Sequence, residues 1–155
     1  KTTSLQTVLP YLEAAAKTIW VHNSFTSVSD ICAVQATNTD AYWCLCPSAN
    51  QYIENTMPPV QLLREQHANI IVGTDSYASN WSLNMLDELK KIQAHNPEIP
   101  LAEMLTWITS NGARALQMED QLGTIEKGKK PGLVLIENIS NQTQLTSSSI
   151  SKRLL

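Results

Sequence analysis

One short run constrains the fold of this 155-residue chain more than any other: NIIVGTDS, from Asn69 to Ser76. Its apolar, β-branched residues are typical of a parallel strand that is buried on both faces. In α/β enzymes the functional side chains follow the carboxyl ends of such strands, and this run presents Asp75 there. The earlier run TIWVHN, from Thr18 to Asn23, ends in a similar way on His22. An imidazole and a carboxylate at two strand ends predict a metal site or an acid–base site.

Strand patterns and helix patterns alternate along the chain, which is typical of βαβ units and a parallel sheet. Strands are predicted at residues 18–22, 41–46, 70–74 and 133–136. Helices are predicted at residues 4–16, 28–36, 58–67, 83–94 and 101–116, and a polar loop at 48–55. Ser27-Val-Ser-Asp30 has the spacing of a capping box at the start of the second helix. The tail, residues 138–155, is rich in Ser, Thr and Gln and is either a β-strand or poorly ordered.

The overall charge and the cysteine count exclude some classes of protein. With a net charge of -3 and a pI near 5.6, the chain is not expected to bind nucleic acid or an anionic membrane. No apolar run is long enough to span a bilayer, and no secretion signal is visible. Three cysteines without a disulfide framework fit a reducing compartment, so a cytoplasmic location is predicted. Two of them, Cys44 and Cys46, share one face of the second strand and are expected to pack there.

Several strand ends and turns carry a resemblance to a known family, and they follow one another in a fixed order. The strand ends are Val21-His22-Asn23, Cys46-Pro-Ser-Ala-Asn50 and Gly73-Thr-Asp75-Ser, the last followed by Ala78-Ser79-Asn80. Asn111-Gly-Ala comes next, and Leu122-Gly and Gly128-Lys precede an apolar strand. In this order they resemble the C-terminal part of the metal-dependent amidohydrolase superfamily, in the branch of cytosine, guanine and adenosine deaminases and chlorohydrolases. The resemblance covers roughly Lys1 to Ile136.

The resemblance implies a fold. Residues 1–120 would form the C-terminal portion of a TIM (β/α)8 barrel, namely strands six to eight with their helices. Residues 121–155 would return to a small β-sandwich and end in a polar tail.

The resemblance also implies roles for individual residues. Asp75 would bind the metal and accept a proton from the attacking water, and His22 would polarise the substrate or that water. Asn50, Ser79 and Asn80 would line the substrate pocket. The metal would be zinc, with iron as the alternative. The substrate would be a small molecule, a nucleobase-like or nucleoside-like ring that loses an amino group. Separately from the resemblance, an open three-stranded parallel sheet would expose its edges and apolar faces, so a homo-oligomer is expected.

The sequence departs from the family pattern in ways that affect activity. The family uses a His-x-His pair on its first strand and a further histidine on its fifth, whereas this chain has three histidines and no His-x-His. A complete barrel also needs about 250 residues. The isolated chain is therefore expected to be inactive, because a catalytic metal needs three or more protein ligands. The alternative is a small flavodoxin-like α/β domain that binds a ligand or partner without catalysis, with Asp75 as a turn or phosphoacceptor-like residue. Helix glutamates, among them Glu54 and Glu88, are expected to be solvated.

Overall fold

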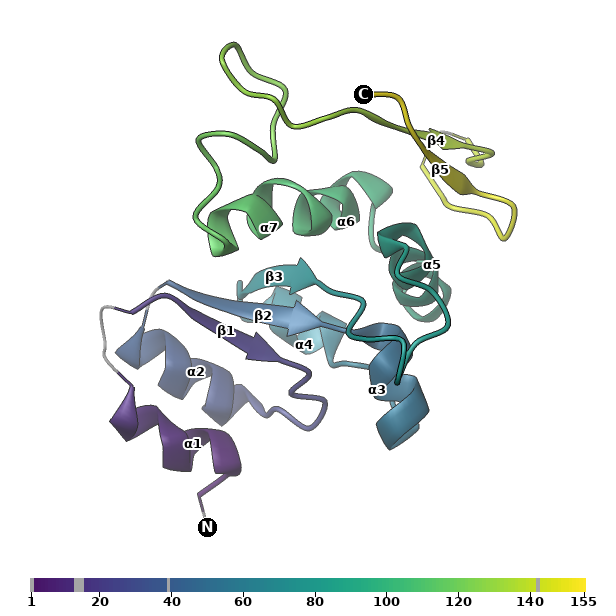
Figure 1. Cartoon of the computed structure of the whole chain (residues 1–155). Helices are drawn as coiled ribbons and strands as arrows, with labels where there is room; N and C mark the ends of the chain where they lie inside the picture. Colours follow the sequence, from purple (N-terminus) through teal and green to yellow (C-terminus); the bar gives the residue numbers. More distant parts are fainter. Residues whose placement is uncertain (1, 13–15, 39, 142) are drawn as a thin grey trace.

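A three-stranded parallel sheet lies at the centre of the computed structural model, which describes residues 2–12, 16–38, 40–141 and 143–155 (Figure 1). Its strands are β1 (Thr18–Val21), β2 (Ala41–Leu45) and β3 (Asn69–Val72), in the order β1-β2-β3. Trp20 pairs with Trp43, and Trp43 pairs with Ile70, so the three strands end at the same edge. The predicted α/β class with a parallel sheet is confirmed.

Helices connect the strands and extend the chain beyond the sheet. The helices are α1 (Ser4–Val8), the 3-10 helix η1 (Leu9–Tyr11), α2 (Val28–Thr37), α3 (Pro47–Glu54), α4 (Val60–Glu65), α5 (Met85–His95), α6 (Leu101–Ile108) and α7 (Ser110–Ala115). The capping box predicted at the start of α2 is present, with Ser27 and Asp30 bonded to each other's backbone N–H groups. Among the described residues, no helix is both long and apolar enough to cross a membrane.

The main core lies between one face of the sheet and the helices. Trp43, Leu45 and Ile70 point into it from the strands and are almost completely buried. Helices α2, α4, α5 and α6 close the core with apolar side chains that include Ile31, Val34, Val60, Leu63, Leu89, Ile92 and Met104. Alternate residues on each strand supply this face, as the two-residue period of a strand requires.

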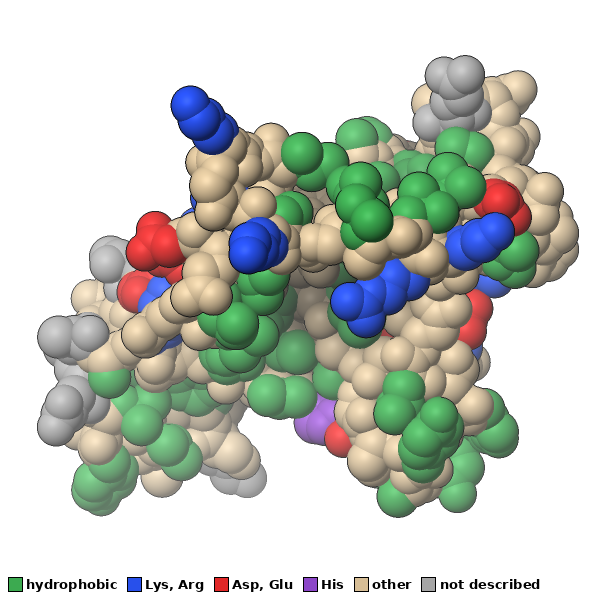
Figure 2. Space-filling model, turned by 45° about the horizontal axis from the view of Figure 1, so that its top comes forward, with side chains coloured by type: hydrophobic (Ala, Val, Ile, Leu, Met, Phe, Trp, Pro, Cys, Tyr) green, Lys and Arg blue, Asp and Glu red, His purple; other side chains and the backbone are tan. Residues whose placement is uncertain are grey.

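The opposite face of the sheet is only partly covered. Tyr42 and Ile71 are buried there in a small cluster with Ala115 of α7. Ile19 and Val21 of β1 lie on the same face, next to Tyr42 and Cys44, and remain 39% and 47% exposed. Apolar side chains also reach the surface elsewhere, as Figure 2 shows for one side of the molecule. Because these β-branched residues are exposed, this face of the sheet is not packed as a protein interior is.

Three of the predicted elements were wrong in extent. The helix predicted at 4–16 ends as α1 at Val8 and continues only as η1, because Pro10 lacks the N–H that an α-helix needs; residues 13–15 lie outside the described residues. The loop predicted at 48–55 is helix α3, which Pro47 opens with its fixed φ. The helix predicted at 101–116 is two helices, separated at Thr109 by a non-helical backbone (φ -122°, ψ -92°).

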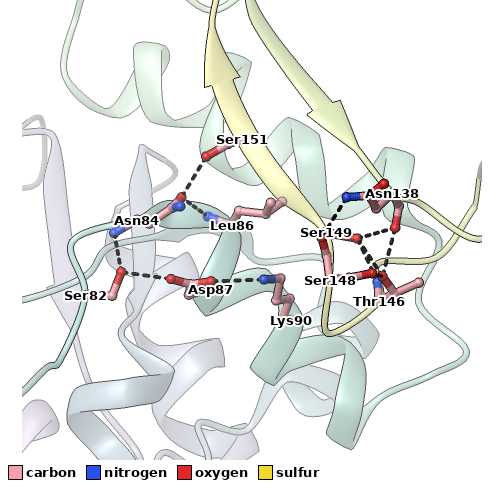
Figure 3. Close-up of polar contacts among 10 residues, drawn as sticks. All are labelled: Ser82, Asn84, Leu86, Asp87, Lys90, Asn138, Thr146, Ser148, Ser149 and Ser151. Carbon is pink, nitrogen blue, oxygen red and sulfur yellow. Dashed lines mark hydrogen bonds and ion pairs between the residues drawn. The ribbon is translucent and has the colours of Figure 1, made fainter.

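The chain ends in a β-hairpin that docks on α5. Strands β4 (Val134–Glu137) and β5 (Ile150–Arg153) pair antiparallel, so the tail does form a strand. A two-stranded hairpin is barely stable alone, and here hydrogen bonds hold it to the rest of the chain. Ser151 bonds to Asn84, the N-cap of α5, which belongs to a network with Ser82 and Asp87 (Figure 3). The division into a barrel part and a sandwich part stays a prediction.

Candidate active site

The two residues that the sequence singled out lie at the carboxyl edge of the sheet. His22 directly follows β1, and Asp75 comes three residues after β3. One strand separates β1 from β3, so about 10 Å lies between their axes. Both residues have left-handed backbones, with φ of 66° at His22 and 57° at Asp75. This conformation is uncommon for residues other than glycine and is concentrated at functional sites.

A buried amide fixes the orientation of the His22 ring. Asn50, on the first turns of α3, is completely buried, and its Oδ1 lies 3.3 Å from His22 Nδ1. The amide nitrogen of Asn50 donates to Ser24 and, at 3.2 Å, to a carboxylate oxygen of Glu54. Because a carboxylate only accepts, that end of the amide must be the NH2 group, and Oδ1 faces the ring. His22 therefore carries a hydrogen on Nδ1 and leaves Nε2 for chemistry.

The carboxylate of Asp75 is held at one oxygen. Ser79 donates a hydrogen bond of 2.5 Å to Asp75 Oδ2. Asp75 itself is exposed, whereas Ser79 is buried with 6% of its surface accessible. No described residue donates to Oδ1, so this oxygen is available to a ligand.

Asn80 is buried behind Asp75 and bonds inward. Its amide nitrogen donates to the backbone oxygen of Thr74 at 2.7 Å and to Glu88 Oε1 at 2.7 Å. The structure thus places Ser79 and Asn80 beside Asp75, and Asn50 beside His22. Whether Asn50, Ser79 and Asn80 also touch a substrate stays a prediction.

Glu88 is the residue that the sequence prediction missed. It was expected to be solvated, but it is completely buried in α5 (0% exposed). Its Oε2 accepts a hydrogen bond of 2.9 Å from the backbone N–H of Ser48. The signal was present in the sequence, since Met85, Leu89 and Ile92 form an apolar stripe at positions i, i+4 and i+7, and Glu88 occupies i+3 of that stripe.

Two thiols lie between the two candidate residues, Cys44 on strand β2 and Cys46 directly after it. A β-carbon at Gly73 would come within 3.1 Å of Cys44 Sγ and 3.5 Å of Cys46 Sγ, so both thiols face that glycine, as their shared strand face predicts. The hydrogen bond between the thiols lowers the pKa of Cys44 and raises the pKa of Cys46. Burial and the negative charge of Asp75 add to the increase in the pKa of Cys46. All three cysteines are free thiols.

The carboxyl edge offers suitable donors for a divalent metal, but few of them. The free oxygen of Asp75 is a hard anionic ligand, and a neutral imidazole nitrogen such as His22 Nε2 is a common zinc ligand. Within the described residues, no three His, Cys, Asp or Glu side chains come together as a metal-binding group. The residues present therefore fit one side of a metal site.

Two surface hollows lie away from the candidate residues. A hollow of about 480 Å³ is lined by Arg64, His67, Glu103 and Trp107, near the amino end of β3. A second one, of about 280 Å³, lies beside it and includes Asn38 and Asn69. Neither hollow is lined by His22 or Asp75. The space-filling view also shows a histidine and an acidic side chain at the edge of a depression (Figure 2).

Comparison with known proteins identifies the family. A model of the amidohydrolase family matches residues 2–152, so the chain belongs to the amidohydrolase family, as its motifs predicted. The 5-methylthioadenosine/S-adenosylhomocysteine deaminase of Teredinibacter turnerae is 34% identical over 124 residues, which are 76% of this chain and 28% of that protein. The adenosine deaminase of Helicobacter pylori is 32% identical over 119 residues, covering 75% of this chain and 29% of that protein.

Solved structures give the same result. Aminofutalosine deaminase of Helicobacter pylori, in complex with methylthio-coformycin, aligns over 92% of this chain and 34% of its own, with a TM-score of 0.71 and 26% identity. An adenosine deaminase from Xanthomonas campestris with bound zinc aligns over 77% of this chain and 28% of its own, with a TM-score of 0.67 and 28% identity. The chain spans less than a third of the length of the Teredinibacter turnerae deaminase and of the Helicobacter pylori adenosine deaminase. The family match gives no support to the flavodoxin-like alternative.

Proposed function

We propose that this chain supplies the catalytic pair of a deaminase that removes an amino group from a nucleobase-like or nucleoside-like ring by adding water. The observation that carries the proposal is the position of His22 and Asp75 at the same sheet edge, each in a left-handed backbone and each held by a hydrogen bond. Family membership supports it, because relatives that align with most of this chain are named adenosine and methylthioadenosine deaminases.

Asp75 would move the proton in this reaction. Water adds to the ring carbon that bears the amino group, and the free oxygen of Asp75 accepts the proton that the water loses. The same proton then passes to the departing nitrogen, which leaves as ammonia while the ring carbon keeps the oxygen. A carboxylate that one hydrogen bond from Ser79 holds in place suits this exchange, because its position does not change between the two transfers.

His22 would bind the oxygen as it is added. Its Nδ1 is engaged by Asn50, so its Nε2 is directed to the reacting group. In the cationic form Nε2–H can donate to an oxygen that becomes negative in the transition state. In the neutral form Nε2 can accept a hydrogen from the attacking water.

A divalent metal, with zinc as the first choice and iron as the second, would be held in part by Asp75. When bound, such a metal lowers the pKa of water to near 7 and makes it a nucleophile at neutral pH. The zinc in the Xanthomonas campestris adenosine deaminase supports this choice. The remaining ligands would come from outside these 155 residues, so the isolated chain would be inactive. A small-molecule substrate, a cytoplasmic location and a homo-oligomeric state complete the proposal.

The proposal is tested by measuring ammonia release from adenosine, 5-methylthioadenosine, S-adenosylhomocysteine and guanine with the zinc-loaded full-length protein. We expect turnover of at least one adenine nucleoside and its loss after treatment with a chelator. No release from any of these rings would contradict a deaminase, and release that the chelator leaves unchanged would contradict the metal.

A further inference from the structure

A buried carboxylate on α5 takes no part in the chemistry proposed above. Glu88 has no exposed surface, and the ion pairs among the described residues do not include it. Neutral donors alone compensate its charge. A buried carboxylate costs far more than an apolar side chain at the same place. Glu88 therefore does something that the leucines and isoleucines around it cannot do.

The two oxygens of Glu88 bind two different loops of the candidate site. Oε2 accepts from the N–H of Ser48, which follows β2, at 2.9 Å. Oε1 accepts from the side-chain amide of Asn80, in the loop after β3, at 2.7 Å. A single carboxylate thus joins two segments that are 32 residues apart in the sequence, since Ser48 and Asn80 bear these numbers.

The first of these bonds orders the helix that holds His22. Cys46 is the N-cap of α3 and makes no side-chain cap bond. Glu88 provides the missing acceptor for a first-turn N–H, and a negative charge is favourable at a helix N-terminus. Asn50 lies two residues after Ser48 on the same turn, and it is Asn50 that contacts the ring of His22.

The second bond orders the loop that holds Asp75. The amide of Asn80 that donates to Glu88 also donates to the backbone oxygen of Thr74, at 2.7 Å. Thr74 immediately precedes Asp75, and Ser79 immediately precedes Asn80 and donates to Asp75 Oδ2. Removing Glu88 would leave Asn80 with its bond to Thr74 alone, and would loosen the loop from which Ser79 donates to the Asp75 carboxylate.

We infer that Glu88 is a positioning residue that sets the placement of His22 and Asp75 relative to each other. The effect of Glu88 on catalysis rests on the proposed function, in which these two residues are the catalytic pair. Its effect on the order of the two loops depends only on its two hydrogen bonds, so the two effects can be measured separately.

The matched variants are Glu88→Gln and Gln93→Glu, both isosteric and both on α5. Glu88→Gln places an NH2 group against one of two donors. Gln93 exchanges two hydrogen bonds of 2.8 Å with the backbone of Leu145, far along the chain from the site. Gln93→Glu places a carboxylate oxygen against the backbone oxygen of Leu145. Each variant therefore breaks one bond of a pair, and only Glu88→Gln does so beside the site.

The first readout is amide hydrogen exchange of the full-length protein. We expect Glu88→Gln to speed exchange about 10-fold at Ser48 or at Ser79, depending on which of the two donors faces the new NH2 group. Gln93→Glu keeps the bond from the Leu145 N–H and should leave exchange at Ser48 and Ser79 unchanged. The second readout is kcat/KM for an adenine nucleoside, which should fall about 10-fold or more in Glu88→Gln and less than about 2-fold in Gln93→Glu.

Each outcome decides the inference. Unchanged exchange at both Ser48 and Ser79 in Glu88→Gln, or equal loss of activity in both variants, would overturn it. If wild type and variants all fail to deaminate, the proposed function fails, while the exchange data still decide the loop-ordering role. If Glu88→Gln does not fold, Glu88→Met removes the buried charge and tests the same point: it should fold, yet lose protection at Ser48.

Discussion

Charged side chains have different surroundings at the two ends of the three-stranded sheet. At the amino end the charged side chains form partly exposed pairs, Lys17 with Asp40 and Arg64 with Glu103. At the carboxyl end a buried carboxylate, Glu88, bonds only to neutral donors, Ser48 and Asn80. Exposed pairs contribute little, whereas a buried polar group that loses its partner costs more than the bond gave. The carboxyl end is therefore the end where small changes have large consequences.

The largest expected effect is on activity at that end. Asp75→Asn keeps the shape of the side chain but removes its ability to accept a proton, so kcat/KM of the full-length protein for the proposed deamination should fall about 100-fold or more. Asp40→Asn makes the same change at the amino end and should leave kcat/KM within about 2-fold. Equal losses of kcat/KM in the two variants would contradict the greater sensitivity of the carboxyl end.

A smaller loss is expected when the His22 ring loses its partner. Asn50→Leu removes the acceptor for Nδ1 and should lower kcat/KM about 10-fold to 100-fold, because the ring can then turn or change tautomer. A variant with the wild-type rate would show that Asn50 does not orient the ring.

Packing at the carboxyl end can be tested by substituting Gly73, with Gly112 of α7 as the comparison. Gly73→Ala places a methyl group 3.1 Å from Cys44 Sγ and should destabilise the fold by about 1–3 kcal/mol. In Gly112→Ala, within helix α7, the nearest atom is 3.8 Å away, and stability should rise by about 0.4–1 kcal/mol. Urea denaturation measures both values, and a neutral Gly73→Ala would mean that the space around the thiols is not tight.

The capping box of α2 gives a pH-dependent contribution. Burial by itself would raise the pKa of Asp30, but hydrogen bonds from Thr3 and Ser27 outweigh it and lower this pKa below its usual value. The stabilisation is therefore present above about pH 4 and is lost as the pH falls through the folded-state pKa. Asp30→Asn should cost about 1 kcal/mol at pH 7. The difference from wild type should shrink below pH 4 in denaturation experiments, and a difference that stays constant with pH would exclude the carboxylate as its cause.

The smallest effect is expected at the amino end. Glu103→Gln breaks the pair with Arg64, in which the nitrogen–oxygen distances are 2.7 and 2.8 Å. Because both side chains are partly exposed, the loss should be below about 1 kcal/mol and should shrink in high salt. A loss of several kcal/mol would show that the amino end is as sensitive as the carboxyl end.

The sequence predicted those features that depend on local patterns. The three parallel strands, the capping box at Ser27 and Asp30, and the placement of His22 and Asp75 at one edge were all predictable from periodicity and order. Helix α3 was missed because its polar residues hide the helix-opening role of Pro47. Glu88 was missed because its partners, Ser48 and Asn80, become neighbours only through packing. Long-range polar contacts leave little trace in a single sequence.

Native mass spectrometry of the 155-residue chain with added zinc tests the central claim most directly. That claim is that Asp75, at the carboxyl edge, supplies one side of a metal site and that the other ligands lie elsewhere. We expect masses at multiples of 17.2 kDa with no tightly bound zinc. One tightly bound zinc per chain would contradict this claim, because the chain would then hold a complete metal site by itself or across a subunit interface.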